Sequence, residues 1–424
     1  MSTVNIKIPE KPKRKYLPEN LTINNWSDLE PFYKGLEKRE LHSVKDLETW
    51  ILDLSELEAV VSENMAWRYI KMTCDTTDKE LVGSYTHFIT EIEPYIAPFA
   101  NTLHKKLIAS PFLDQLDQNK YFIYLRSIKK SLEIFREENI PLLTEINNES
   151  QKYGAITGAQ SIEYNGEEMT IQKAAVYLKN TDRKIRELIY KRIQARRDED
   201  EKELNELFDR LIVLRNKVAL NAGFQNYRDY KFEELGRFDY APQDCFNFHE
   251  AIRKNIVPLN VAHEKERKEK LKLDPYRPWD TEVDVDGKPP LHPFKDGAEL
   301  LDKSIKCFYE VNTYFGECLE TMKIMHHLSL ESRIGKAPGG YNYPLYETGV
   351  PFIFMNAVGT HRDLVTMVHE GGHAIHSFLS KDLPVTEFKS MPSEVAELAS
   401  MSMELISMEH WQMFFPNNDD YKRA

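Results

Sequence analysis

The sequence predicts a mainly α-helical fold that includes a small amount of β-structure. From residue 25 to about 146, apolar residues recur every three or four positions, which is the spacing of a buried helix face. The clearest such run is Leu47, Ile51, Leu54, Leu57 and Val61. Two other stretches differ. An Asn165-Gly166 pair predicts the turn of a β-hairpin near residues 160–170, and the apolar run 352–355 predicts a buried strand.

Helical patterns return after the hairpin, from residue 171 to about 221 and again from 297 to 315. The dense mixed-charge run 180–202 is typical of a solvated helix face. Residues 1–18 are rich in Lys and Pro, and we expect a flexible arm there that is poorly ordered or lies along the surface.

Length, charge and cysteine usage bound the possible functions. A chain of 424 residues is long enough for two or three domains, or for one large two-lobed unit. The net charge of −12 argues against nucleic acid as the main partner. No run of 18 apolar residues is present, so we expect no membrane span. The four cysteines lack CxxC spacing and the start of the chain lacks the apolar core of a signal peptide, so we expect a cytoplasmic protein.

Residues 369–373 read His-Glu-Gly-Gly-His, which is the most informative motif of the chain. On an α-helix, residues four apart differ by about 40° of rotation, so His369 and His373 would point the same way and could hold one metal ion. Glu370 lies about 60° round the helix from His373, where it could take a proton from a water molecule as a general base. A chance pentapeptide on a solvated helix is the alternative.

The surroundings of this motif indicate a buried helix. Thr360 and Asp363 form a capping-box-like start, which places His369 more than two turns inside. A stripe of apolar residues follows: Val365, Val368, Ile375 and Leu379. Gly371 and Gly372 each cost about 1 kcal/mol inside a helix. Close approach of substrate or another backbone would explain them, and so would close packing of a neighbouring helix.

A catalytic zinc usually takes a third protein ligand, which must come from elsewhere. Leu379 stands where a metzincin would have its third His. Downstream, Glu397 and Glu404 are seven residues apart and share one face of a predicted helix that starts near Ser393. The apolar positions Val395, Leu398, Met401 and Leu405 indicate that this helix is packed against something. A surface row of glutamates on an amphipathic helix is the alternative.

Several segments together resemble the thimet-oligopeptidase-like family of zinc peptidases, and within it the oligoendopeptidase F branch. The motif at 369–373, followed by Glu397-Leu398-Ala399-Ser400 and then Glu404, carries most of this resemblance. It extends over the chain from about residue 110 onward, with further matches at Tyr164-Asn165-Gly166-Glu167, Asn180-Thr181-Asp182-Arg183, 336–341, 351–356 and Gly359-Thr360-His361.

The resemblance implies a zincin-like, two-lobed fold with a deep substrate channel and the small sheet beside the metal helix. We expect a helical lobe over residues 1–195 and a catalytic lobe over 196–424. Glu397 is then the third ligand of one zinc ion, and Glu404 a partner of a ligand histidine. The implied activity is hydrolysis of short unfolded oligopeptides, with Glu370 as general base. Two imidazoles and one carboxylate suit zinc. Nothing in the sequence indicates an oligomeric state.

The family continues beyond the metal site with a segment that carries oxyanion-stabilising His and Tyr residues, and we do not find these before Ala424. We therefore expect a catalytic lobe that is incomplete at its C-terminal end. Loss of an oxyanion donor typically costs about 10²–10³ in rate. The alternative function is a zinc-retaining, catalytically weak fragment that binds peptides.

The segment 335–359 is rich in Gly, Pro and Tyr and precedes the motif helix directly. A strand beside the metal site could pair with an extended peptide through main-chain hydrogen bonds, although a purely structural strand is as good an interpretation. The candidate substrate-binding residues are Gly339, Gly340, Tyr341, Phe354 and Asn356.

Overall fold

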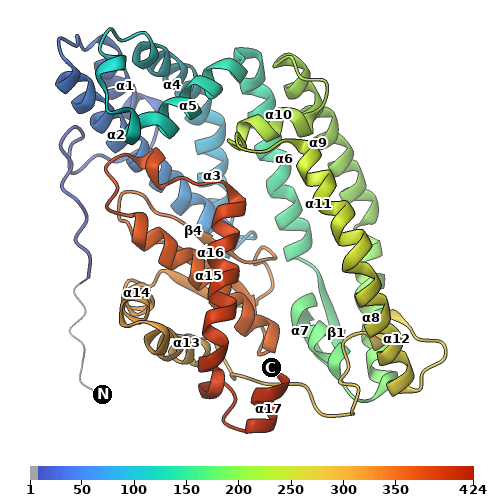
Figure 1. The fold of residues 1–424 in the computed structure, drawn as a ribbon. Coiled ribbons are helices and arrows are strands. Elements are labelled where there is room, and N and C mark those ends of the chain that lie inside the picture. The colour runs from blue at the N-terminus through green and yellow to red at the C-terminus, as the bar shows by residue number, and fades with distance from the viewer. Residues whose placement is uncertain (1–7) are drawn as a thin grey trace.

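The computed structural model describes residues 8–424, and its N-terminal part is a group of helices around one core (Figure 1). The helices are α1 (Glu30–Lys38), α2 (Val44–Cys74), α3 (Lys79–Glu91), α4 (Glu93–Ile108) and α5 (Gln118–Ile134). The α2 helix begins after Ser43, whose hydroxyl accepts the backbone N–H of Asp46. The apolar stripe predicted for α2 is confirmed, since all five of its residues are buried.

The middle part of the chain contains the predicted hairpin and a series of helices. The helices are α6 (Ile140–Gly158), α7 (Ile171–Ala175), α8 (Arg183–Glu199), α9 (Glu201–Asn221), α10 (Tyr227–Glu234), α11 (Pro242–Asn255) and α12 (Val257–Leu271). The hairpin is confirmed: β1 (Ser161–Tyr164) pairs antiparallel with β2 (Glu167–Thr170). Its turn residues, Asn165 and Gly166, both have positive φ, as the tight turn requires.

The C-terminal part contains the motif helix and a three-stranded sheet. Its helices are α13 (Gly297–Val311), α14 (Thr313–Ile324), α15 (His361–Ser380), α16 (Ser393–Ser407) and α17 (Asn418–Arg423). The sheet has the order β3 (Leu328–Glu331), β5 (Phe352–Ala357), β4 (Tyr341–Tyr343). The predicted buried strand, β5, is central, parallel to β3 and antiparallel to β4. Both sides of β5 are therefore paired, and β4 is the edge strand that lies near α15.

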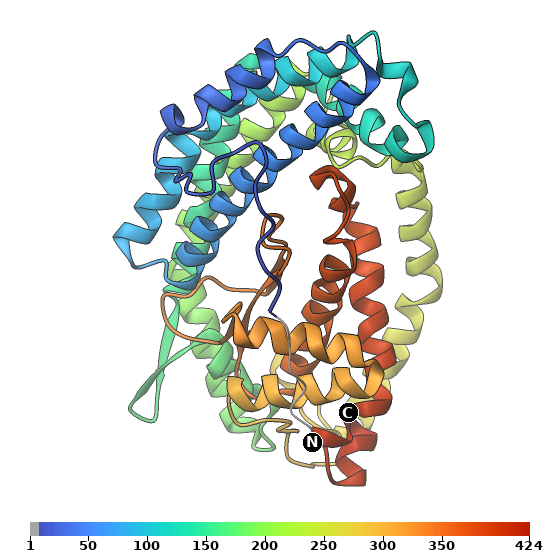
Figure 2. The same ribbon diagram turned by 90° about the vertical axis from the view of Figure 1, so that its left-hand side faces the viewer.

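Figure 1 shows α9 and α11 along one side of the molecule and α15 and α16 along the other, with α1, α4 and α5 across the top. Figure 2 shows α13 and α14, in orange, below the N-terminal helices, in blue. This arrangement agrees with the helical, two-lobed fold implied by the resemblance. The boundary expected at residues 195 and 196 falls inside α8, and that division stays a prediction. Within residues 8–424, no helix is both long and apolar enough to span a membrane.

The start of the chain is tied to the N-terminal helices rather than free. Residues 1–7 of the predicted flexible arm lie outside the described residues. From Arg14 onward the arm is in contact with the rest of the chain, since the Arg14 guanidinium forms an ion pair of 2.6 Å with Glu347, in the segment between β4 and β5. Its flexibility stays a prediction. The Glu56 carboxylate accepts the backbone N–H groups of residues 15–17, and Leu17 is buried in the core.

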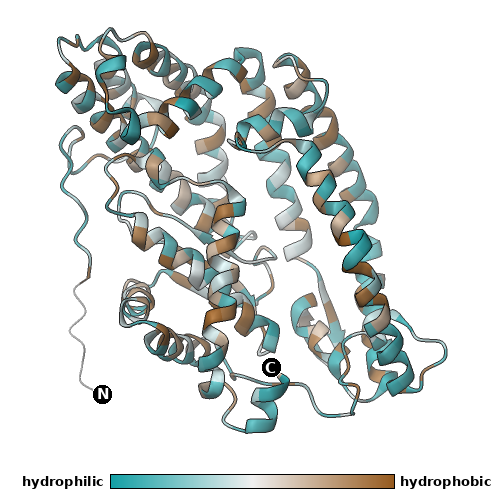
Figure 3. Cartoon of the chain, in the orientation of Figure 1, coloured by the Kyte–Doolittle hydropathy of each residue, from teal (hydrophilic) through white to brown (hydrophobic). Residues whose placement is uncertain are grey.

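The apolar stripe predicted to pack α16 is instead exposed. Leu398 and Leu405 are 68% and 69% exposed, and Val395 and Met401 are also exposed. Figure 3 shows brown, hydrophobic residues along α16. The helix packs through a different face, whose buried residues are Ser400, Met403 and Ser407. The packing partner is α15, so the helix is packed as expected but through two serines and one methionine rather than the predicted stripe.

Candidate metal centre

The motif lies well inside α15, as the capping residues predicted. The Thr360 hydroxyl accepts the backbone N–H of Asp363, and the Asp363 carboxylate accepts the backbone N–H of Thr360 at 2.8 Å. The predicted burial of the helix is confirmed at Val368 and Ile375, whereas Leu379 is 64% exposed. The helix directly follows β5, so the strand-then-helix order is also as predicted.

The two glycines of the motif allow neighbouring helices to approach α15 closely. A Cβ atom on Gly372 would lie 2.7 Å from the Cα of Ser400 in α16. A Cβ atom on Gly371 would lie 2.5 Å from the ring of Phe308 in α13. Both distances are shorter than any normal contact. Of the explanations open from the sequence, close packing of neighbouring helices is the one observed, and at Gly372 it brings the backbone of α16 against the motif.

This close packing places Glu397 of α16 over the two motif histidines. One ligand atom each from His369, His373 and Glu397 lie within 4.8 Å of one another. The Nε2 atom of His369 is 3.4 Å, and that of His373 3.7 Å, from the Glu397 carboxylate. The two imidazole rings are mutually perpendicular with centroids 4.9 Å apart. We call these three residues the ligand triad.

Further side chains of α16 orient the ligand triad. The Glu404 carboxylate is 2.7 Å from Nδ1 of His369. When Nδ1–H donates to this carboxylate, Nε2 is left with its lone pair directed at the triad. The buried Ser400 hydroxyl donates to the Glu397 backbone carbonyl at 2.9 Å and lies 3.4 Å from its carboxylate. The role expected for Glu404, as partner of a ligand histidine, has this contact as its support.

Glu370 differs from the triad because it is buried and incompletely paired. Glu370 is 6% exposed, and its Oε2 atom has no hydrogen-bond partner among residues 8–424. Burial raises the pKa of Glu370 to about 7, against an opposing effect of the neighbouring His369. A carboxylate with this pKa can both accept and return a proton near neutral pH.

The candidate substrate-binding residues divide between the site and the core. A Cβ atom on Gly340 would lie 3.4 Å from Oε1 of Glu370, so the backbone passes close to the motif. The Asn356 amide donates to the carbonyls of Ala337 and Gly339, both at 2.9 Å, and thereby holds the segment that leads into β4.

The two aromatic candidates pack on each other. Phe354 is fully buried and its ring stacks on that of Tyr341 at 4.7 Å, while the Tyr341 hydroxyl bonds to Thr73 of α2. Phe354 therefore supports the sheet rather than facing a substrate. The central strand β5 is paired on both sides, so a free backbone edge is available only on β3 and β4, and β4 is the one that contacts α15.

Two polar residues near the triad were not selected from the sequence. Asn342, in β4, and His376, one turn after His373 in α15, each have a buried side-chain nitrogen without a partner among the described residues. The spacing of three residues between His373 and His376 was a signal for a shared helix face. No sequence signal indicated Asn342, because its role depends on how β4 lies against α15.

The family of the chain is decided by comparison with known families. The model of peptidase family M3 matches residues 176–302 and 308–424, more than half of the chain. The chain belongs to peptidase family M3. The model of the M3 N-terminal domain matches residues 19–135. The match to the peptidase family M3 model, over residues 308–424, contains α15 and α16 in full and therefore the complete ligand triad.

Relatives within the M3 family agree with the branch that the motifs indicated. Oligoendopeptidase F (chromosomal) of Lactococcus lactis subsp. cremoris is 24% identical over 186 residues, 44% of this chain and 30% of its own length. Group B oligopeptidase PepB of Streptococcus agalactiae is 23% identical over 410 residues, 89% of this chain and 64% of its own. The chain thus spans less than two thirds of either relative.

A solved structure of PZ peptidase A with an inhibitor has the same fold. It superposes with a TM-score of 0.90 at 24% identity, and the match covers 96% of this chain and 73% of the other. This similarity confirms the mainly helical architecture with its small sheets.

The M3 family implies a zinc ion, and the residues present fit one. The donor set is two imidazole nitrogens and one carboxylate, which is a ligand combination of catalytic zinc sites with a fourth position left for water. The Glu404 carboxylate lies 2.7 Å from Nδ1 of His369, which is the kind of contact that outer partners of zinc ligands usually make. The unpartnered Oε2 of Glu370 provides a further fit, because this buried oxygen lacks a group that a water molecule at the metal would supply.

Proposed function

We propose that the chain acts as a zinc-dependent endopeptidase that hydrolyses short, unfolded oligopeptides. The observation that carries this proposal is the convergence of His369, His373 and Glu397 beside the buried carboxyl group of Glu370. Membership of family M3 supports the peptidase class, and the names of its relatives support oligopeptides as substrates. One zinc ion would be held by the ligand triad.

In this proposal, one residue of the site transfers a proton, and the others orient a ligand or align the peptide. A bound zinc ion supplies Lewis-acid polarisation of a carbonyl group and lowers the pKa of a water molecule toward about 7. Glu370 accepts the proton of the attacking water at its carboxylate and returns it to the leaving amine. Glu404 holds the His369 ring in one orientation throughout. The backbone edge of β4, with Gly339 and Gly340 at its start, aligns the extended peptide.

The test compares the wild-type chain with Glu370→Gln. Zinc content is measured by elemental analysis, and hydrolysis is followed with an internally quenched peptide. We expect one zinc per chain in both proteins and hydrolysis only in the wild type. If zinc is stoichiometric and both proteins are equally inactive, the endopeptidase proposal fails for this chain.

The alternative is a peptide-binding protein that retains zinc but turns over slowly. One observation favours its consideration: the Glu397 side chain is 49% exposed. Peptide binding by both proteins with hydrolysis by neither would support this alternative. We propose a cytoplasmic location on the basis of the cysteine usage alone.

A further inference from the structure

A cavity of about 240 Å³ adjoins the ligand triad on the side of His373. It extends along α15 past His376 and Ser377, between the edge strand β4 and the segment 389–396 that leads into α16. This volume is well above the roughly 10–15 Å³ of such space that one water molecule needs, so the cavity can hold a side chain. Because His373 forms one wall, a substrate residue close to the cleaved bond would enter this cavity.

The lining of this cavity is basic. It includes Lys381, Lys389 and two histidines, and it contains no Asp or Glu. Lys381 is already paired, since its ammonium group lies 2.7 Å from the Asp382 carboxylate. The ammonium group of Lys389 forms no ion pair or hydrogen bond within the part of the chain that the structure describes. Burial lowers the pKa of Lys389, although the charge of Asp382 opposes this effect.

Two further polar groups in the wall lack partners. The side-chain nitrogen Nδ2 of Asn342 and the ring nitrogen Nδ1 of His376 are buried and unbonded. Buried donors without partners are costly and rare, and here both belong to the wall that also contains Lys389. The Asn342 amide is a donor and the His376 nitrogen can be one, so both can bond an oxygen anion.

We propose that this cavity is a substrate subsite that binds a carboxylate, with Lys389 as its specificity-determining residue. The carboxylate belongs to a Glu or Asp side chain next to the cleaved bond or to the C-terminus of a short peptide. The ammonium group of Lys389 and the amide of Asn342 would bind it with charge-assisted and neutral hydrogen bonds. This subsite rests on the proposed peptidase function.

The test measures binding separately from cleavage. Zinc-loaded Glu370→Gln protein is titrated with fluorescent hexapeptides that carry Glu or Gln at each position in turn, each with a free or an amidated C-terminus. We expect at least one Glu peptide, or the free-acid series, to bind with a roughly tenfold lower Kd than its neutral counterpart. The position of the effect distinguishes a side chain from the peptide terminus as the source of the carboxylate.

Substitutions at the two lysines of the wall identify the responsible charge. Lys389→Met should abolish the preference, Lys389→Arg should keep it, and Lys389→Glu should favour peptides with Lys over peptides with Glu. Lys381→Met is the matched control, because Lys381 is paired with Asp382, and it should retain the preference. Thermal melting shows that each variant is folded.

The outcomes separate the subsite from the peptidase proposal. Equal Kd values for acidic and neutral peptides, or a preference that survives Lys389→Met, would overturn the subsite while wild-type hydrolysis still supports the peptidase. Selective binding in a protein whose wild type hydrolyses none of these peptides would support the subsite and overturn the peptidase function.

Discussion

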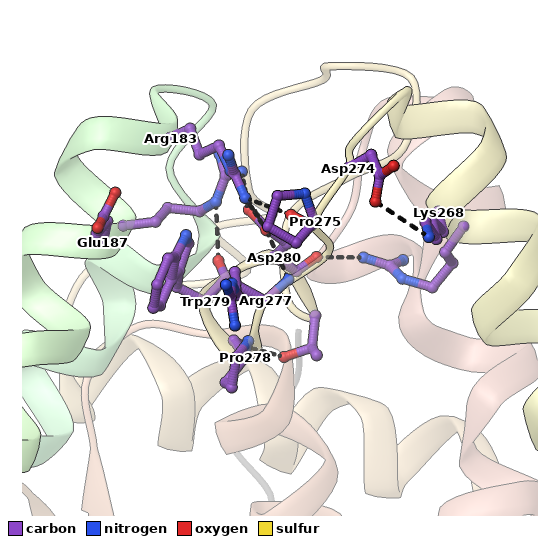
Figure 4. A network of polar contacts seen from close by, with 12 residues as sticks. Arg183, Glu187, Lys268, Asp274, Pro275, Arg277, Pro278, Trp279 and Asp280 are labelled. Atoms are coloured by element: carbon purple, nitrogen blue, oxygen red, sulfur yellow. Dashed lines mark hydrogen bonds and ion pairs between the residues drawn. The ribbon is translucent and has the colours of Figure 1, made fainter.

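Asp280 and Glu370 are both carboxyl groups withdrawn from solvent, at 0% and 6% exposure, but their surroundings differ completely. Asp280 accepts hydrogen bonds from the guanidinium groups of Arg183 and Arg186 at 2.8–3.0 Å, and from the backbone N–H of Arg277 (Figure 4). Burial opposes its ionisation, but the two guanidinium groups outweigh this effect and lower its pKa. No cationic side chain of the described residues is hydrogen-bonded to Glu370, and burial raises its pKa to about 7.

The difference separates a structural carboxylate from a reactive one. The acceptor positions of Asp280 are used by groups that join the 3₁₀ turn Pro278–Asp280 to α8, so its charge contributes to the fold. One oxygen of Glu370 has no partner, which is a cost that the fold tolerates next to the ligand triad. If this interpretation is right, substitution of Glu370 should affect catalysis and substitution of Asp280 should affect stability.

The largest expected effect is on catalysis, in Glu370→Gln. Removal of a general base lowers kcat/KM by about 10²–10⁴-fold. The same substitution should leave the thermal midpoint unchanged or raise it, because Gln has no charge to keep buried. Hydrolysis of a quenched peptide and differential scanning calorimetry provide the two measurements. If Glu370→Gln destabilised the protein as much as Asp280→Ala does, the distinction between a reactive Glu370 and a structural Asp280 would be wrong.

Asp280→Ala should reduce stability rather than activity. Removing one partner of a buried ion pair leaves two guanidinium groups uncompensated, at a cost of about 3–5 kcal/mol. Urea unfolding followed by circular dichroism measures it, with substitution of the exposed Asp274 as a control. A folded population of Asp280→Ala that has lost zinc binding would contradict the assignment of Asp280 to the fold.

The free energy of unfolding should depend on the ionisation of Asp280 at low pH. The pKa of Asp280 is lowered in the folded protein, so its stabilising contribution is present above the unfolded value of about 3.9 and is lost as the pH falls below it. Urea unfolding of the wild type between pH 3 and pH 6 should therefore show a decline below about pH 4. In Asp280→Asn this part of the decline should be smaller. Identical pH profiles for the two proteins would contradict the prediction.

Much of the metal centre was predictable from the sequence, because its main features are local. Helical spacing alone brings His369 and His373 to one side, and a separation of seven residues puts Glu397 and Glu404 on one face. The Asp280 network was not predictable, since its arginines lie about a hundred residues earlier. The mixed-charge run 180–202 predicted a solvated face, yet Arg186 within it is 3% exposed. A charge pattern does not reveal a distant carboxylate.

The exposed stripe of α16 shows a second limit. The spacing of Leu398, Met401 and Leu405 correctly predicts a shared face of the helix but does not say what covers it. The helix instead approaches α15 with the face that carries Ser400 and Met403, and Gly372 leaves room for the backbone of α16 there. Close approach of two backbones favours Gly and Ser over large apolar residues, so hydrophobic periodicity pointed to the wrong side of α16.

Glu404→Gln should weaken the metal centre without removing a ligand. A neutral amide still accepts the hydrogen bond from His369 but no longer supplies negative charge behind the ring. Loss of such a partner costs about 10–100-fold in metal affinity or activity. Competition with a zinc chelator measures the affinity. The matched control is Glu409→Gln, because Glu409 is exposed and lies outside the site. Equal zinc affinities in the two variants would show that Glu404 has no role at the metal.

Gly372→Ala tests whether helix packing sets the position of Glu397. The added methyl group would meet the Ser400 Cα, and overpacking of this kind costs about 1–3 kcal/mol. Because the obstacle is backbone, α16 must shift and carry Glu397 with it, so zinc affinity should fall together with stability.

Gly371→Ala is the matched control, since its methyl group meets the Phe308 ring of α13 and leaves α16 in place. It should reduce stability by a similar amount but keep more of the zinc affinity. Equal losses of affinity in both variants would show that the glycines only support the core and do not position the third ligand.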